Sequence, residues 1–216
     1  MKIIKKLKKG YTLAEMLIAM VLMGTIACLL TPVLLVAPSQ SVFVKEYRRA
    51  YEEIDTATTS LVKSHGYTLN GACGVMDNPH NCLKDLYAGF FEPTLRVCND
   101  GTTFGNCWHK PSEYHRMDGQ EIAFPNTSGF ITKDGVLVYF ISYEPYCSTK
   151  IDWAKGIEPC GIVMLDVNGF SKPNKIGRDI YSIWILKDRL LPFGTAIDGF
   201  DGDKKTTGWG YSTSSL

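Results

Sequence analysis

Hydrophobic positions predict a long helical segment in the first third of the chain. Residues 16–37 contain no charged side chain, and these 22 residues would form a helix of about 33 Å. From Phe43 to Leu61, apolar residues recur every three or four positions with charged residues between them, the pattern of an amphipathic helix. We therefore expect one helix, kinked at Pro32 and Pro38, that ends near Ser64.

The second half of the chain shows the pattern of short strands. Runs rich in β-branched and aromatic residues are joined by Asp-Gly or Asn-Gly, which favour tight hairpins. The predicted strands are 130–132, 136–142, 161–167 and 179–186. Between helix and strands, residues 66–128 are rich in Gly, Asn, Asp and Pro, so they predict irregular structure with one helical turn around 82–87. The predicted fold class is α+β, with a long N-terminal helix packed on a C-terminal antiparallel sheet.

Cysteine spacing points to an oxidising compartment. Of seven cysteines, Cys28 lies in the apolar segment, and the other six follow as pairs 9, 9 and 13 positions apart. An even number beyond a membrane segment is typical of a disulfide framework. Six cysteines allow 15 pairings, and we favour the three local ones because short loops close at the least entropic cost. The pairs are Cys73 with Cys82, Cys98 with Cys107, and Cys147 with Cys160.

Charge is distributed asymmetrically. The first ten residues hold five lysines and no acid, so the rest of the chain carries a net charge of −4. Lysines before an apolar span place that end in the cytoplasm and the residues after it outside. A cleaved secretory signal is the competing interpretation, but its apolar region would be shorter. No basic patch predicts nucleic-acid binding.

Glu15 is the acid nearest the apolar segment. An acidic group placed deep in a bilayer costs about 2.5 to 3.5 kcal/mol, so a carboxylate retained there needs a partner. If Glu15 lies in the headgroup region instead, it is solvated and needs none. The sequence around it, KKGYTLAE followed by an apolar run, decides between these interpretations.

These residues resemble the leader of type IV pilins and type II secretion pseudopilins, over positions 8 to about 32. The resemblance implies that a prepilin peptidase cleaves after Gly10 and methylates the new amine of Tyr11. Tyr11 departs from the phenylalanine usual in the family. In a fibre, the Glu15 carboxylate would then meet the amine of a neighbouring subunit in a low-dielectric core, which fixes the axial offset between subunits.

Two further positions in the apolar segment match this family. Gly24 and Pro32 stand where its members carry residues that weaken the helix. The resemblance also implies the pilin architecture, in which a long N-terminal helix packs on an antiparallel sheet. The implied partners are the prepilin peptidase, other pilin or pseudopilin subunits and an assembly platform in the inner membrane. The implied location is a single pass through that membrane, with the C-terminal domain outside.

The chain is accordingly divided into six expected parts. They are a cleaved leader (1–10), a transmembrane and assembly helix (11–38), an amphipathic helix (39–65), an irregular disulfide-stapled region (66–128), an antiparallel sheet (129–195) and a C-terminal tail (196–216).

Metal binding has weak support from the sequence. Asp166 and Asn168 could supply oxygen ligands to calcium, as could Asp198, Asp201 and Asp203 in DGFDGD. Ordinary turns explain both stretches equally well. We therefore predict no cofactor, with calcium as the alternative.

Enzymatic activity has no positive support in the sequence. His109, Glu113 and His115 in WHKPSEYH could bind a metal, but Pro111 keeps them off one helical face. Cys107 and His109 could form a nucleophile and base, although Cys107 is expected in a disulfide. We predict a structural fibre subunit, a minor one because the mature chain would have 206 residues. The alternative is a membrane-anchored binding or adhesive domain outside the cytoplasm that does not polymerise.

Overall fold

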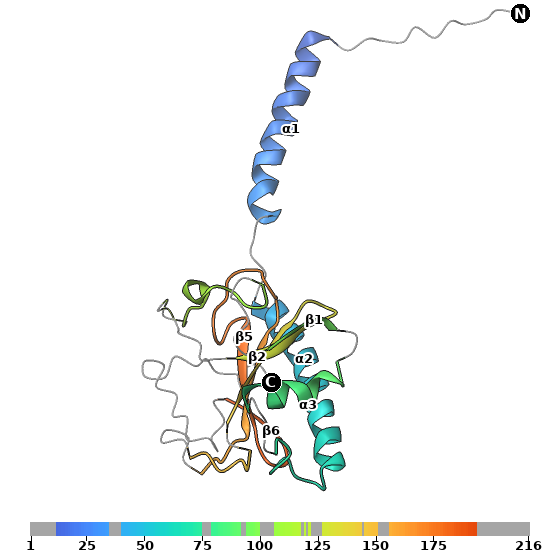
Figure 1. Cartoon of the computed structure of the whole chain (residues 1–216). Coiled ribbons are helices and arrows are strands. Elements are labelled where there is room, and N and C mark those ends of the chain that lie inside the picture. The colour runs from blue at the N-terminus through green and yellow to red at the C-terminus, as the bar shows by residue number, and fades with distance from the viewer. Residues whose placement is uncertain are drawn as a thin grey trace, which may run out of the picture. The chain divides into compact units, whose positions relative to one another are not determined.

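The computed structural model describes residues 12–34, 40–74, 79–91, 94–99, 106–117, 119, 121, 127–143, 145–150 and 156–193, with the backbone alone for 28–34 and 79. The chain divides into two compact units, residues 1–39 and residues 40–216. Figure 1 shows the helices and strands of the two units.

The first unit contains helix α1, Leu13–Leu34. Its 22 residues are hydrophobic on every side, so the helix has no polar face that would mark one side as solvent-facing. Pro32 lies in its last turn, where the missing N–H shortens the hydrogen-bond ladder close to its end. Residues 35–39, which include the predicted kink at Pro38, lie outside the described residues.

The second unit begins with helix α2, Gln40–Ser64, whose apolar stripe faces the core. The predicted stripe from Phe43 to Leu61 is the buried face of this helix. The Thr58 hydroxyl lies 2.7 Å from the Tyr87 hydroxyl, which joins α2 to the short helix α3, Cys82–Ala88. The helical turn predicted around 82–87 is therefore present.

A six-stranded antiparallel sheet forms the rest of this unit, with strands in the order of the sequence. The strands are β1 Thr94–Cys98, β2 Ser128–Thr132, β3 Leu137–Ser142, β4 Gly161–Asp166, β5 Ile180–Ile185 and β6 Leu190–Pro192. Each neighbouring pair is antiparallel, as expected for strands joined by hairpins. The predicted α+β, pilin-like fold is thus confirmed.

Both faces of the central strands of the sheet, β2 to β5, are buried. One face packs on α2 and α3 through side chains such as Phe130, Phe140 and Val163. The other face packs on the segment 106–117 through Trp108 and Tyr114. Side chains alternate between the two faces of a sheet, and here both faces are covered. Strands β3, β4 and β5 therefore have no exposed residue. The sequence signals this burial by near-continuous apolar runs in these strands.

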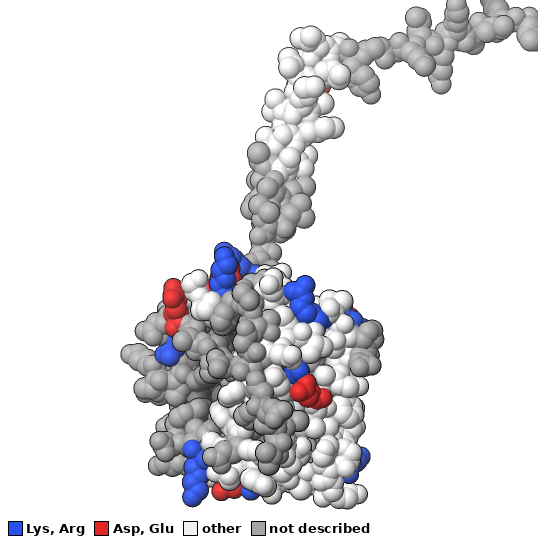
Figure 2. Space-filling view, viewed as in Figure 1, with Lys and Arg blue, Asp and Glu red and all other residues white. Residues whose placement is uncertain are grey.

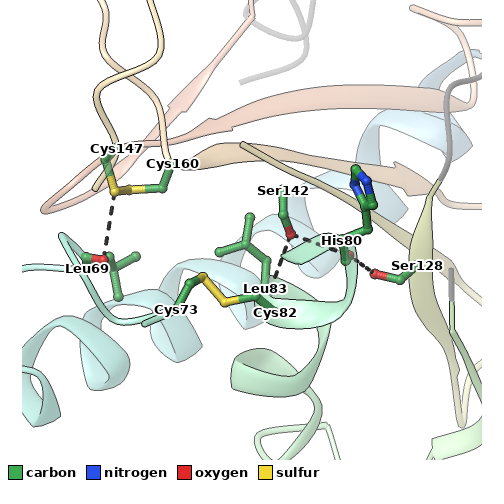
Figure 3. The surroundings of a disulfide bond; sticks show 9 residues. All are labelled: Leu69, Cys73, His80, Cys82, Leu83, Ser128, Ser142, Cys147 and Cys160. Atoms are coloured by element: carbon green, nitrogen blue, oxygen red, sulfur yellow. Dashed lines mark hydrogen bonds between the residues drawn. A yellow bond between two sulfur atoms is a disulfide. The ribbon is translucent and has the colours of Figure 1, made fainter. Parts of the chain in front are cut away.

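Three disulfides join the cysteines as the three local pairs favoured by the sequence. The Cys73–Cys82 bond connects the segment after α2 with the first residue of α3 (Figure 3). Beside it, the His80 carbonyl accepts hydrogen bonds from the hydroxyls of Ser128 (2.6 Å) and Ser142 (3.4 Å). These contacts fix the start of α3 on β2 and β3.

Candidate functional site

The start of α1 is closed by a reciprocal cap between Thr12 and Glu15. The Thr12 backbone N–H donates to Glu15 Oε2 at 2.8 Å, and the Thr12 hydroxyl donates to the same oxygen at 3.0 Å. The Glu15 backbone N–H donates in return to Thr12 Oγ1 at 3.3 Å. This is a capping box, which satisfies helix N–H groups that have no partner within the helix.

Glu15 is exposed and has no cationic partner among the described residues. The cap leaves its carboxylate at the helix N-terminus, where the helix dipole favours negative charge. The capping role of Thr12 was not predicted from the sequence, although Thr-x-x-Glu before an apolar run is the signature of this cap.

The remaining predicted residues of this segment are only partly described. Gly10 and Tyr11, the predicted cleavage position, lie outside the described residues. Gly24 lies within α1, and a Cβ at this position would meet no atom within 4 Å. Pro32 lies in the last turn of the helix.

The described side chains of α1 are all exposed within the chain, including Met16, Leu17 and Val21. In Figure 2 the described side chains of this helix are almost entirely white, because Glu15 is the only charged residue among them. By its length and hydropathy, none of the described helices qualifies as a membrane span. The described side chains of α1 therefore form an exposed apolar surface.

A groove of about 490 Å³ opens in the second unit between α2 and two turns of the sheet. Its floor includes Ala50, Ile54 and Leu165, and its wall includes Phe170. The rim carries Glu46, Glu53 and Asp134 and one cation, Arg49. The Arg49 guanidinium lies 3.5 Å from Glu53 and 2.5 Å from Asp134, so the groove has an apolar floor and an acidic rim.

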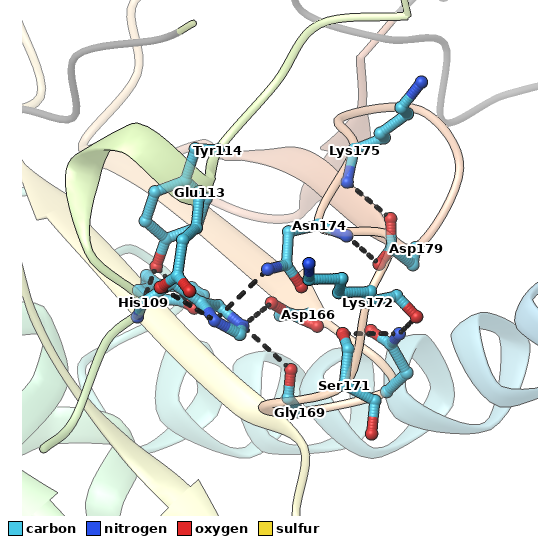
Figure 4. A network of polar contacts seen from close by, with 12 residues as sticks. His109, Glu113, Tyr114, Asp166, Gly169, Ser171, Lys172, Asn174, Lys175 and Asp179 are labelled. Carbon is cyan, nitrogen blue, oxygen red and sulfur yellow. Dashed lines mark hydrogen bonds and ion pairs between the residues drawn. The ribbon is translucent and has the colours of Figure 1, made fainter. Parts of the chain in front are cut away.

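A buried polar network lies on the opposite face of the sheet and centres on His109 and Asp166 (Figure 4). Both side chains are buried, with 4% and 0% of their surface exposed. His109 Nε2 lies 3.0 Å from the Gly169 carbonyl and 3.4 Å from Asp166 Oδ2. Its Nδ1 lies 3.3 Å from Asn174 Nδ2.

Two tyrosines extend this network under the sheet. The His109 backbone N–H donates to the Tyr114 hydroxyl at 3.1 Å, and that hydroxyl lies 3.0 Å from the hydroxyl of Tyr139. Burial raises the pKa of both phenols above their ordinary value of 10.0, so they stay neutral. The network therefore joins segment 106–117 to β3 and β4.

The residues considered for catalysis do not form an open site. Cys107 is bonded to Cys98, so it cannot serve as a thiolate nucleophile. Glu113 lies 3.8 Å from His109 Nδ1, whereas His115 forms isolated β-bridges with Glu121 and Lys175. Over the described ranges, no group of three or more His, Cys, Asp or Glu residues could hold a metal ion.

The calcium candidates fall into two groups. Asp166 faces His109, and the Asn168 amide donates to the carbonyls of Ser171 (2.9 Å) and Lys172 (3.0 Å). The second group lies outside the described residues: Asp198, Asp201 and Asp203.

Comparison with known families identifies the N-terminal segment. The prokaryotic N-terminal methylation motif matches residues 5–27. The chain therefore carries the cleavage and methylation segment of type IV pilins and pseudopilins, as the resemblance at positions 8 to about 32 predicts. This motif indicates a structural protein rather than an enzyme. No curated protein and no solved structure matches the chain.

Proposed function

We propose that this chain is a structural subunit of a type IV pilus or a type II secretion pseudopilus, and specifically a minor one. The observation that carries the proposal is the methylation motif at residues 5–27, which runs into an apolar helix with its described side chains exposed. Such a helix is suited to bury itself against lipid before assembly and against copies of itself or related subunits afterwards.

Maturation follows from the same segment. A prepilin peptidase cuts the bond between Gly10 and Tyr11 and methylates the Tyr11 amine. The lysine-rich leader holds this end in the cytoplasm, α1 anchors the chain in the inner membrane, and residues 40–216 are exported. The three disulfides agree with an oxidising compartment for the exported unit. The remaining partners are other subunits and the inner-membrane assembly platform.

Replacing Gly10 by Val is expected to block this maturation almost completely. A glycine without Cβ allows a protease close to the extended backbone, and a β-branched side chain does not. Immunoblots of membranes and of sheared fibres should show the uncut chain in the membrane fraction and none in the fibres. Gly24→Ala, a glycine change in the same segment with open space around it, should be cut normally.

The groove between α2 and the sheet favours a second candidate function. An apolar floor with an acidic rim is the form of a binding site for a ligand with apolar and cationic groups. A membrane-anchored binding domain that never polymerises would use this groove and would not need Glu15. If Gly10→Val and the unmodified chain are equally absent from fibres, the second candidate is favoured.

A further inference from the structure

The network around His109 joins segment 106–117 to the connection between β4 and β5. Neither segment belongs to helix α1, through which fibre assembly is proposed. Its imidazole contacts the Gly169 carbonyl at 3.0 Å and lies edge-on to the Phe170 ring, with 5.3 Å between ring centres. His109 itself comes from segment 106–117, which the Cys98–Cys107 disulfide ties to the sheet edge. The β4–β5 connection, residues 167–179, therefore rests on His109.

Acceptor atoms exceed donors in this network. Both carboxylate oxygens of Asp166 and the amide oxygens of Asn168 and Asn174 are buried and accept no hydrogen bond of good geometry from the described residues. The donors that lie near the Asp166 carboxylate are the His109 Nε2–H at 3.4 Å, the Asn168 backbone N–H and the Tyr139 hydroxyl. The His109 Nε2–H also faces the Gly169 carbonyl. A buried carboxylate with so few donors is costly in its charged form. Protonation of Asp166 or of His109 Nδ1 would supply the missing hydrogen-bond donor.

Two acidic side chains lie near the His109–Asp166 pair. Glu113 lies 3.8 Å from His109 Nδ1, and Asp179 lies in the same connection. Asp179 is occupied by the backbone N–H groups of Asn174 and Lys175, each at 2.7 Å. Within the described part of the chain, no lysine or arginine forms an ion pair with Asp166. The negative charges of Glu113 and Asp179 therefore favour retention of the proton.

We propose that His109 and Asp166 retain this proton as a latch that holds the β4–β5 connection on segment 106–117, and that loss of the proton as the pH rises from acidic to above neutral releases the connection. The latch reaches the other face of the sheet, because Asn168, Gly169 and Phe170 also line the groove beside α2. Release of the connection loosens one wall of that groove.

The directions of the two pKa shifts agree with this latch. Burial raises the pKa of Asp166 from 3.8 to about 7, against the opposing effect of His109. Burial lowers the pKa of His109, but contacts with Asp166 and the Gly169 carbonyl outweigh it and raise the pKa above 6.5. Both groups bind protons more tightly in the folded state. The latch is therefore fully formed below the ordinary pKa of Asp166 and weakens as pH rises through the shifted values.

Amide hydrogen exchange of the full chain in detergent micelles tests the latch. After correction for intrinsic exchange, protection of 166–180 and 106–117 should fall at least about tenfold between about pH 5 and about pH 8. Asp166→Asn, which removes the titrating carboxylate, should show no such fall. Glu158→Gln, at an exposed ion pair with Lys187, should behave as the unmodified chain.

Two results would overturn the latch. One is protection of 166–180 that does not change with pH in the unmodified chain. The other is a fall that Asp166→Asn retains. If that variant does not fold, an NMR titration of the His109 imidazole in the unmodified chain decides the question, because its signals report a proton on either member of the pair. A titration step between about pH 5 and about pH 8 supports the latch, and signals that do not change over this range refute it.

Discussion

Replacing Glu15 by Gln is expected to leave cleavage and membrane insertion intact and to remove the chain from fibres almost completely. In the assembled fibre, the Glu15 carboxylate would neutralise the amine of Tyr11 on a neighbouring subunit. Removing one partner of a buried ion pair leaves the other charge uncompensated, at a cost of about 3 to 5 kcal/mol. The amount of the chain in sheared fibres, relative to the membrane fraction, measures the effect.

Three variants separate the charge of Glu15 from its role in the helix cap. Gln at this position can still form a capping box with Thr12, so Glu15→Gln changes the charge alone. Glu15→Ala loses the charge and the cap. Thr12→Ala keeps the charge and weakens the cap, at about 1 kcal/mol of helix stability.

The expected order follows from these differences. Glu15→Gln and Glu15→Ala should both be missing from fibres, whereas Thr12→Ala should be incorporated nearly normally. Normal incorporation of Glu15→Gln together with loss of Thr12→Ala would show that the cap, not the charge, is what assembly needs. The proposed pairing with the Tyr11 amine would then be wrong.

Replacing Gly129 by Ala is expected to destabilise the second unit by at least about 3 kcal/mol. Gly129 lies in β2 between β1 and β3, and a Cβ there would come within 1.9 Å of the Val138 carbonyl oxygen and 2.9 Å of the Trp108 ring. The backbone oxygen belongs to the paired strand and cannot move without breaking the sheet. Denaturant unfolding of the oxidised chain measures the loss of stability.

Gly89→Ala is the matched control for this change. Gly89 ends α3 with a φ of −63°, and a Cβ there would meet nothing within 4 Å. The free energy of unfolding of the Gly89→Ala variant should match that of the unmodified chain within about 0.5 kcal/mol. Equal stability of the Gly129→Ala and Gly89→Ala variants would contradict the pairing of β2 with β3.

Local patterns in the sequence predict much of the fold. The apolar stripe of α2 and the hairpin turn after Thr132 depend on contacts between residues close in the chain, which periodicity and turn chemistry encode. The Cys73–Cys82 pairing is local in the same sense. For these elements the sequence is a sufficient guide. The tight hairpin predicted at Asn168-Gly169 is wrong, because the chain turns there but reaches β5 only at Ile180.

Non-local packing explains what the sequence did not predict. Strand β1, Thr94–Cys98, lies inside the region predicted to be irregular, and its apolar Leu95 and Val97 are exposed rather than buried in a core. Strand β6 has three residues and one is Pro192, a residue that argues against a central strand. Both are edge strands that depend on a neighbour already in place.

The candidate functional residues show the same difference between local and non-local contacts. Glu15 and its apolar helix can be recognised from a continuous stretch of sequence. By contrast, His109 and Asp166 lie 57 positions apart and meet only because segment 106–117 covers one face of the sheet. From the sequence, His109 was considered as a metal ligand in a loop. No residue near it in the chain indicated that its partner would be the buried Asp166.

Mass spectrometry of the N-terminal peptide of the chain, purified from its native membranes or fibres, tests the central claim most directly. We expect the peptide to begin at Tyr11 with a methyl group on its amine, because the chain carries the prokaryotic N-terminal methylation motif at residues 5–27 and Gly10 precedes Tyr11 within it. A chain that still begins with Met1 and its lysine-rich leader has no free amine at Tyr11 for a neighbouring Glu15, and that result would contradict the account.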